Sequence, residues 1–184
     1  MNKTRLEALS DGIFAVVMTL AIFQFKVPAG GNLFSSQLLF MLLIYVTTFI
    51  VLASIWNSHH HVLTFLHDQK VDELILWSNH ALLLMISLFP FLTVAHATYP
   101  HSLSANIGYV LNYIFMWLGI SAFSQLIYKK YAPSETLRLR NRKRIKMFFF
   151  FFLPGALISI VWLYALPIIT ILMALSWGRH TDFE

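Results

Sequence analysis

The chain has 184 residues, of which 58% are hydrophobic and 11% charged, and its mean hydropathy is +0.70. A soluble domain could not bury so much apolar surface, so this balance excludes an ordinary soluble protein and predicts an integral membrane protein. Cysteine is absent, which excludes a disulfide framework, thiolate chemistry and cysteine-based metal sites.

Apolar segments follow one another along the chain with short polar connections, and residues 1–184 are predicted to form a single all-α transmembrane domain. Since one helical crossing takes about 20 residues, the length allows about six crossings. The last apolar block is too long for one crossing at about 1.5 Å per residue and divides near residues 164–167. Pro90 predicts a kink in the third span. The six predicted transmembrane helices are residues 10–25, 35–56, 74–97, 105–128, 148–163 and 167–177.

The positive charges are concentrated in one connection. Eight of the thirteen Lys and Arg residues fall within residues 129–146, whereas Lys26 stands alone on the opposite side of the membrane. The positive-inside rule therefore places this basic loop and both termini in the cytoplasm, which requires an even number of crossings. Such a loop is expected to contact anionic lipid headgroups rather than nucleic acid.

An apolar stripe runs along one side of the first predicted helix. Each residue of an ideal helix advances by about 100 degrees, which places four further residues within about 60 degrees of Val16. Side chains of these types at helical spacing either pack against another helix or line a pore where several copies meet, and the pattern alone leaves both open. The stripe consists of Gly12, Val16, Thr19, Leu20 and Phe23.

A polar cluster, which contains Arg5, Glu7, Ser10 and Asp11, precedes and overlaps the start of this span. Ser10 and Asp11 point about 120 and 140 degrees away from Val16, and so away from the stripe. A charge near the membrane core is costly unless it is paired, so Asp11 is expected to have a partner in its own subunit: Arg5, a histidine or an amide. The alternative is that Arg5 and Asp11 are interfacial anchors.

The run Arg-x-x-x-Leu-Ser-Asp at residues 5–11, followed by Gly-Ile-Phe-Ala-Val-Val-Met-Thr-Leu, resembles a known signature. The prokaryotic branch of the transmembrane protein 175 (endosomal/lysosomal-type potassium channel) family carries Arg-x-x-x-Phe-Ser-Asp at this place. Leu9 departs from the Phe of that signature, which removes one aromatic contact and leaves the polar residues in place. Further matches come in the family's order over the first three spans: Trp56, His59 and His60, then Trp77-x-Asn79, then Pro90-Phe91-x-Thr93.

This resemblance implies a potassium-permeable cation channel of the prokaryotic plasma (inner) membrane, with K⁺ as the permeant ion and no cofactor. It implies a homotetramer in which the first helix of each subunit lines a central pore without a carbonyl filter. Constriction would come from rings of apolar side chains with a hydroxyl ring nearby. At the matching positions these rings are Val16, Thr19 or Leu20, and Phe23.

The resemblance also assigns the polar residues to a brace that holds the first helix against its own subunit. Three adjacent histidines on a helix point about 100 degrees apart and do not converge on one ion, so we predict no metal site at His59, His60 and His61. The predicted brace consists of Arg5, Ser10, Asp11, Trp56, His59, His60 and Asn79.

Two other classes of function fit a multi-pass membrane protein less well. A proton-coupled secondary transporter would use Asp11 and the histidines as a proton relay, but the sequence offers little polarity at the middle of the membrane. A membrane enzyme would need a metal motif, a nucleophile constellation or a Gly-rich phosphate loop, and the sequence has none of these. We therefore predict a channel and no enzymatic activity.

Overall fold

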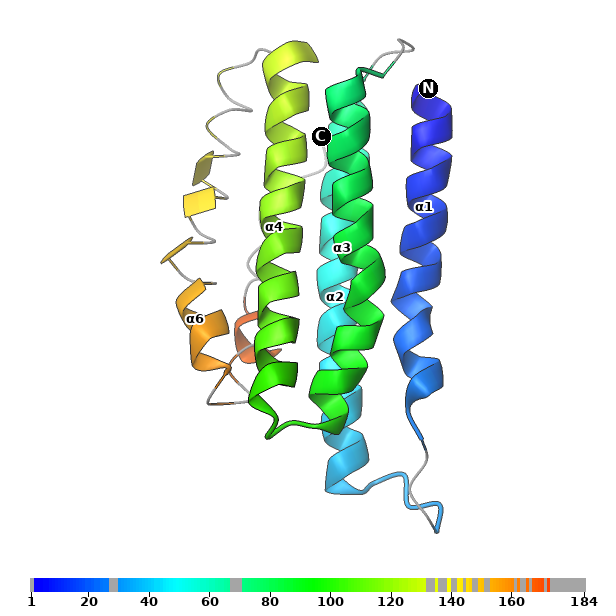
Figure 1. Cartoon of the computed structure of the whole chain (residues 1–184), viewed down its shortest axis with the longest axis vertical. Helices are drawn as coiled ribbons and strands as arrows, with labels where there is room; N and C mark the ends of the chain where they lie inside the picture. The colour runs from blue at the N-terminus through cyan, green and yellow to red at the C-terminus, as the bar shows by residue number, and fades with distance from the viewer. Residues whose placement is uncertain are drawn as a thin grey trace.

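The computed structural model describes residues 2–26, 30–66 and 71–131, together with residues scattered between 135 and 172. Four helical segments of this part of the chain are long and apolar enough to cross a membrane. They run antiparallel to one another, and α2 and α3 lie between α1 and α4 (Figure 1). The elements are α1 (Lys3–Leu20), the short 3₁₀ helix η1 (Ala21–Gln24), α2 (Ser36–Leu63), α3 (Glu73–Thr98), α4 (Leu103–Tyr131) and α6 (Leu153–Ile158).

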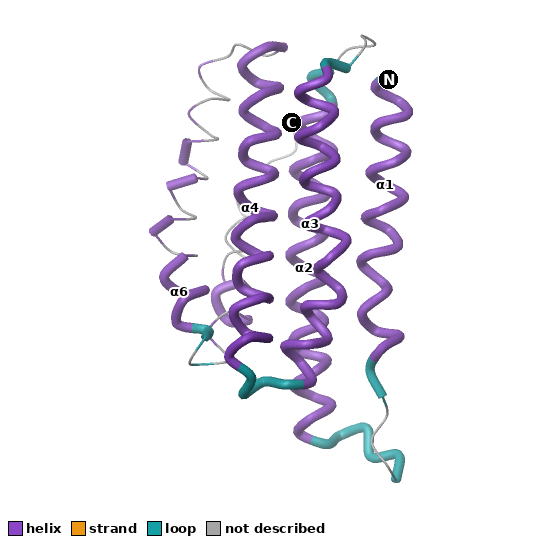
Figure 2. Tube along the Cα trace, in the orientation of Figure 1, coloured by secondary structure: helices purple, strands orange, loops and turns teal. Residues whose placement is uncertain are grey.

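The predicted all-α character holds throughout the described elements, and the trace in Figure 2 is helical apart from short connections. The first four predicted spans each overlap one of the long helices. Of the last two, residues 148–163 contain α6, but residues 148–177 are described only in short, separate pieces, and residues 173–177 lie outside the described part of the chain. The number of six helices per subunit therefore stays a prediction.

The second helix is longer than the sequence indicated. The predicted second span ends at residue 56, whereas α2 continues through His59, His60 and His61 to Leu63. Hydropathy alone does not show this continuation, because it depends on tertiary contacts: His59, Val62 and Leu63 are all buried in the bundle, and their packing extends the helix.

Local sequence features explain where the helices begin. The side chain of Asn2 accepts a hydrogen bond from the Arg5 amide, so α1 begins well before its apolar core. Ser35 is the N-cap of α2, and its hydroxyl accepts from the Leu38 amide at 3.3 Å. In the connection between them, Gly30 and Gly31 have φ of +93° and +71°, a conformation that favours glycine.

The bundle packs most tightly between α3 and α4. A Cβ built on Gly119 would lie 3.2 Å from Leu82 Cδ1, and one built on Gly108 would lie 3.3 Å from Leu92 Cδ2. Small residues that let helix backbones approach closely are the usual means of packing in membranes. Near Pro90, the Asn112 amide of α4 donates to the Met85 carbonyl of α3 at 3.0 Å, so a neighbouring helix bonds the α3 backbone five residues before the proline.

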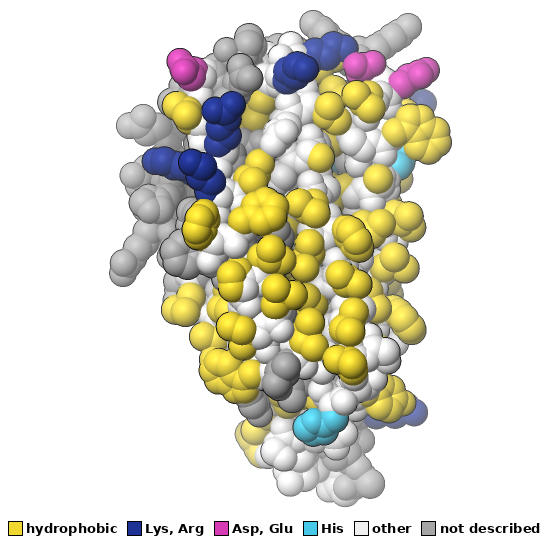
Figure 3. Space-filling model, turned by 60° about the vertical axis from the view of Figure 1, so that its left-hand side comes forward, with side chains coloured by type: hydrophobic (Ala, Val, Ile, Leu, Met, Phe, Trp, Pro, Cys, Tyr) yellow, Lys and Arg dark blue, Asp and Glu magenta, His cyan; other side chains and the backbone are white. Residues whose placement is uncertain are grey.

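Charged side chains gather at one end of the molecule. Figure 3 shows hydrophobic side chains over the middle of one face, with most Lys, Arg, Asp and Glu side chains at the end that carries the N-terminus. At this end Lys130 donates to Asp72 at 2.8 Å, which ties the start of α3 to the end of α4. This hydrogen bond lowers the pKa of the exposed Asp72 carboxyl below its ordinary value.

Candidate functional site

A buried polar chain fastens α1 to the rest of the bundle. Ser10, Asn79 and His59 come from α1, α3 and α2, and all three have no exposed surface. The Asn79 side-chain amide donates to Ser10 Oγ at 3.2 Å, and its Oδ1 lies 2.7 Å from His59 Nε2. Ser10 in turn donates to the Leu6 carbonyl at 2.8 Å. One side of α1 is thus hydrogen-bonded to two neighbouring helices.

The hydrogen bonds of Asn79 determine which nitrogen of the His59 ring carries the proton. Since the NH₂ group of Asn79 is committed to Ser10, its oxygen accepts from His59 Nε2–H, and the other ring nitrogen carries no proton. That nitrogen, Nδ1, is buried and has no hydrogen-bond partner in the described structure. The ring stacks on Phe123 of α4 at 5.0 Å between centroids and meets Phe14 of α1 at 5.7 Å. Aromatic packing therefore holds the imidazole from both sides.

Asp11 has a different partner from those expected. Its carboxylate accepts a hydrogen bond from the Trp56 indole at 2.8 Å, and Trp56 stacks on His60 with centroids 5.7 Å apart. Asp11 thus has a partner in its own subunit, as expected, but that partner is an indole and not Arg5, a histidine or an amide. The indole N–H of Trp56 can donate a hydrogen bond but cannot accept one, so a carboxylate is a suitable partner for it. Trp56 lies on α2, which places the indole beside α1.

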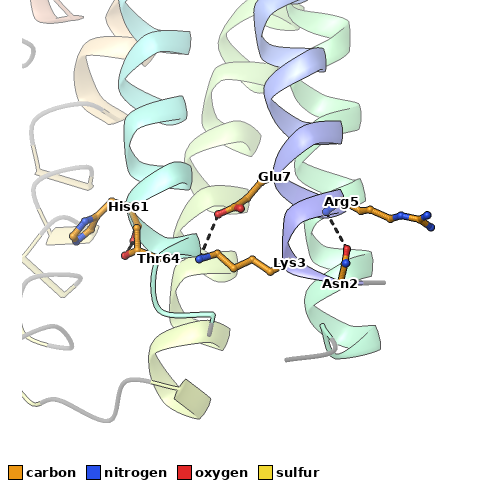
Figure 4. Close-up of polar contacts among 6 residues, drawn as sticks. All are labelled: Asn2, Lys3, Arg5, Glu7, His61 and Thr64. Carbon is orange, nitrogen blue, oxygen red and sulfur yellow. Dashed lines mark hydrogen bonds and ion pairs between the residues drawn. The ribbon is translucent and has the colours of Figure 1, made fainter. Parts of the chain in front are cut away.

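Arg5 stands apart from the other residues of the predicted brace. Its backbone amide donates to Asn2, while its guanidinium points away from Lys3 and Glu7 and away from the nearby α2 residues His61 and Thr64 (Figure 4). Lys3 and Glu7 form an ion pair at 3.7 Å on the other side of the helix. The structure therefore brings together six of the seven predicted brace residues and leaves the Arg5 side chain exposed on the outside of the subunit.

The opposite side of α1 has no cover within the subunit. Val16, Leu20 and Phe23 are 56%, 42% and 82% exposed, and Gly12 and Thr19 are exposed as well. The Thr19 hydroxyl donates to the Val16 carbonyl at 3.0 Å, so the lone pairs of its oxygen remain available as acceptors on the exposed side. The whole predicted stripe thus lies on one open face of the helix, opposite the bonded side.

A second buried polar cluster, which the sequence reasoning did not single out, lies toward the other end of the bundle. The Thr48 hydroxyl is 3.2 Å from Thr93 and 3.1 Å from the Tyr109 hydroxyl. His96 stacks on Tyr109 at 4.7 Å and is 2.8 Å from Asn106 Oδ1. Of these residues only Thr93 belonged to a noted motif, and isolated polar residues in apolar helices were the one available signal for the others.

Phe14, Phe123 and Tyr45 were also missed. Phe14 and Phe123 enclose His59, and the Tyr45 hydroxyl bonds the backbone of α1. Aromatic residues are so common in this chain that their positions in the sequence carry no signal. Among the described residues, no three His, Cys, Asp or Glu side chains gather in an arrangement that could hold a metal ion.

Comparisons with known proteins find relatives over most of this chain. A family model for the endosomal/lysosomal potassium channel TMEM175 matches residues 5–90. A potassium channel of Chryseobacterium sp. (strain P1-3) is 30% identical over 180 residues, which cover 96% of this chain and 93% of that protein. A potassium channel of Chamaesiphon minutus is 26% identical over 147 residues, covering 76% and 71% of the two chains.

The fold is similar to a solved structure as well. The crystal structure of a lysosomal potassium-selective channel TMEM175 homolog from Chamaesiphon minutus covers 98% of each chain with a TM-score of 0.69 and 21% identity. The matched residues 5–90 contain the whole open face of α1 and every residue that bonds its opposite side. Members of this family are ion channels and not enzymes. The chain belongs to the TMEM175 family of potassium channels.

Proposed function

We propose that four copies of this chain form a potassium-permeable cation channel whose central pore is lined by α1 of each subunit. The observation that carries the proposal is the division of α1 into two sides. One side is tied to α2 and α3 through Ser10 and Asp11, and the other, with Val16 and Phe23, is open. A helix held so firmly at its back presents a fixed face to other copies.

The open face suits a hydrophobic constriction. Rings of Val16, Leu20 and Phe23 around a four-fold axis form a narrow apolar passage that closes by dewetting. Thr19 lies beside these rings and its hydroxyl oxygen replaces part of the hydration shell of a cation. Potassium passes as the permeant ion, and the pore requires no cofactor.

The transporter alternative gains no support from the polar residues. Asn79 and Thr93 mark the two buried polar clusters on α3, and they are 14 residues apart, or about 21 Å along a helix. The α3 side chains buried between them include Leu82, Leu83, Ile86 and Phe89, which cannot pass a proton. The buried α3 side chains therefore offer no proton-carrying group to a relay from Asp11 across the subunit.

The distribution of charge supports an orientation. The N-terminus and the end of α4, which carries Lys129 and Lys130, lie at the same end of the bundle (Figure 1), and six further Lys and Arg residues follow within residues 131–146. We place this end and both chain termini in the cytoplasm of a prokaryote, with residues 129–146 against the anionic headgroups of the plasma membrane.

Potassium flux from liposomes containing the purified protein tests the proposal. We expect flux in the unaltered channel, and an increase with Val16→Ala or Phe23→Ala, because smaller side chains widen the apolar rings and lower the barrier to wetting. Leu111→Ala is the matched control, since Leu111 is also exposed and apolar but lies on α4, away from α1.

Flux in the control is expected to equal that of the unaltered channel. Unchanged permeation in both α1 variants would count against a constriction at these residues. Absence of potassium flux from the unaltered protein would refute the channel itself.

A further inference from the structure

The first transmembrane segment changes from an α-helix to a tighter helical turn just before it ends. The helix is α-helical to Leu20 and becomes a 3₁₀ turn over Ala21–Gln24, which closes with a bond from the Phe25 amide to the Ile22 carbonyl at 3.3 Å. Ala21 is buried and η1 packs against α3, so the tighter turn is part of the packed bundle.

This change alters the direction of Phe23. In an ideal 3₁₀ turn each residue advances by about 120 degrees, so residues three apart are eclipsed, and the 3₁₀ turn brings Phe23 toward the line of Leu20. Had the α-helix continued, Phe23 would stop up to about 60 degrees short of that line, closer to the line of Val16, and about 1.5 Å less far along the axis. The direction of the most exposed side chain on this face therefore depends on which turn forms.

The 3₁₀ turn leaves one backbone carbonyl without its α-helical donor. In a continuous α-helix the Met18 carbonyl would accept from the Ile22 amide, but that amide lies within η1. In the structure the Met18 carbonyl accepts a hydrogen bond from the Tyr45 hydroxyl of α2 at 3.2 Å. Because an unbonded carbonyl is costly inside a membrane, this external donor offsets the main cost of the tighter turn.

The Tyr45 ring is itself held in place. It meets Phe25 edge-on with centroids 6.4 Å apart, and it lies 6.4 Å from the ring of Phe49, one turn along α2. The aromatic contacts hold the ring, and the hydroxyl makes the bond to α1. Removal of the hydroxyl alone leaves the packing in place.

We infer that Tyr45 is a positioning residue of the constriction: its hydrogen bond to the Met18 carbonyl maintains the 3₁₀ turn that turns Phe23 into line with Leu20. The inference rests on the proposed pore, and Tyr45 acts through Phe23 rather than on the ion. Without the hydroxyl, the Met18 carbonyl regains a donor only if the α-helix continues. Phe23 then rotates toward the line of Val16, where four rings obstruct the passage more.

Tyr45→Phe is the decisive variant, with potassium flux from liposomes as the first measurement. We expect the variant to lower flux in the otherwise unaltered channel and to have no effect in a Phe23→Ala background, because the hydroxyl acts through the Phe23 ring. An equal loss in both backgrounds would mean that Tyr45 has a general structural role, and no loss in either would overturn the inference. Tyr99→Phe, at an exposed tyrosine, is the matched control.

A second measurement does not depend on conduction. Because the chain has no native cysteine, Gln24→Cys introduces a single thiol, which a charged thiol reagent can modify. Gln24 is exposed in the structure, and continuation of the α-helix would turn position 24 by about 80 degrees, toward the flank of the open face. We expect Tyr45→Phe to change the modification rate about three- to tenfold, the ratio that one ordinary hydrogen bond supports.

The two measurements separate the inference from the proposed function. If Tyr45→Phe changes the modification rate but the protein shows no potassium flux, the role of Tyr45 in the turn is supported and the proposed pore is refuted. If the unaltered protein shows normal flux but Tyr45→Phe leaves the modification rate unchanged, the pore is supported and the role of Tyr45 is refuted.

Discussion

Asn79 is the residue on which the bonded side of α1 depends most, because its amide serves two helices at once. Its oxygen accepts from His59 and its nitrogen donates to Ser10, all without exposed surface. Asn79→Ala removes both bonds and leaves His59 Nε2–H buried without an acceptor. An unsatisfied buried donor costs about 1–3 kcal/mol, so we expect the variant to lower the thermal unfolding temperature in detergent.

Ser78→Ala is the control for this variant. Ser78 is the neighbour of Asn79, but its hydroxyl bonds only the Ile75 carbonyl of its own helix, so we expect almost no change in unfolding temperature. Equal unfolding temperatures for the two variants would show that the hydrogen bonds joining Ser10, Asn79 and His59 contribute nothing to stability.

At the residue scale, the sequence predicts features that are local to one helix better than it predicts contacts between helices. The angular count separated Ser10 and Asp11 from Val16 because that separation is a local property of one helix. The contacts of Ser10 and Asp11 are made by residues far apart in sequence: Asn79 lies 69 positions after Ser10, and Trp56 lies 45 positions after Asp11. The resemblance to a known family named these partners, but the pairing of Asp11 with the indole needed the tertiary structure.

At the scale of whole elements, the positions of the four long helices followed from hydropathy, and their ends did not. The end of α2 was misplaced because buried partners of His59 override its polarity. The 3₁₀ turn of η1 could not be foreseen either, since it depends on a donor from another helix, Tyr45. Ends of helices are decided by tertiary contacts, which hydropathy does not contain.

The close packing of α3 on α4 gives a prediction about two elements together. Gly119→Ala would place a methyl group 3.2 Å from Cδ1 of Leu82, a side chain that is only 1% exposed and has little room to move. Overpacking costs about 1–3 kcal/mol, whereas exchanging glycine for alanine in a helix returns about 1 kcal/mol. We expect a net loss of about 1 kcal/mol, measured as a lower unfolding temperature in detergent.

Gly12→Ala provides the comparison, because a Cβ at Gly12 meets nothing within 4 Å in the subunit. Only the gain in helix propensity then applies, and the stability of the subunit is expected to rise slightly. A stabilising Gly119→Ala would show that the two helices separate easily at this point.

At the scale of the whole molecule, an exposed apolar surface contacts either lipid or another subunit, and neither hydropathy nor burial distinguishes the two cases. Val16 of α1 and Phe115 of α4 are 56% and 50% exposed, and in a membrane such side chains face either lipid or another copy of the chain. What distinguishes the exposed face of α1 is Thr19, whose hydroxyl suits an aqueous passage better than it suits lipid.

A cross-linking experiment tests the resulting arrangement of subunits. In a ring with α1 at its centre, the four copies of position 16 approach the symmetry axis, whereas the copies of position 115 lie far apart on the outside. Since the chain has no native cysteine, Val16→Cys and Phe115→Cys each carry one thiol per subunit. We expect mild oxidation in the membrane to give covalent dimers with Val16→Cys and monomers with Phe115→Cys, as resolved by denaturing electrophoresis.

One thiol can join only two chains, so cross-linked species larger than dimers would point to random collision. Dimers that form with Phe115→Cys alone would place α4, and not α1, at the contact between subunits.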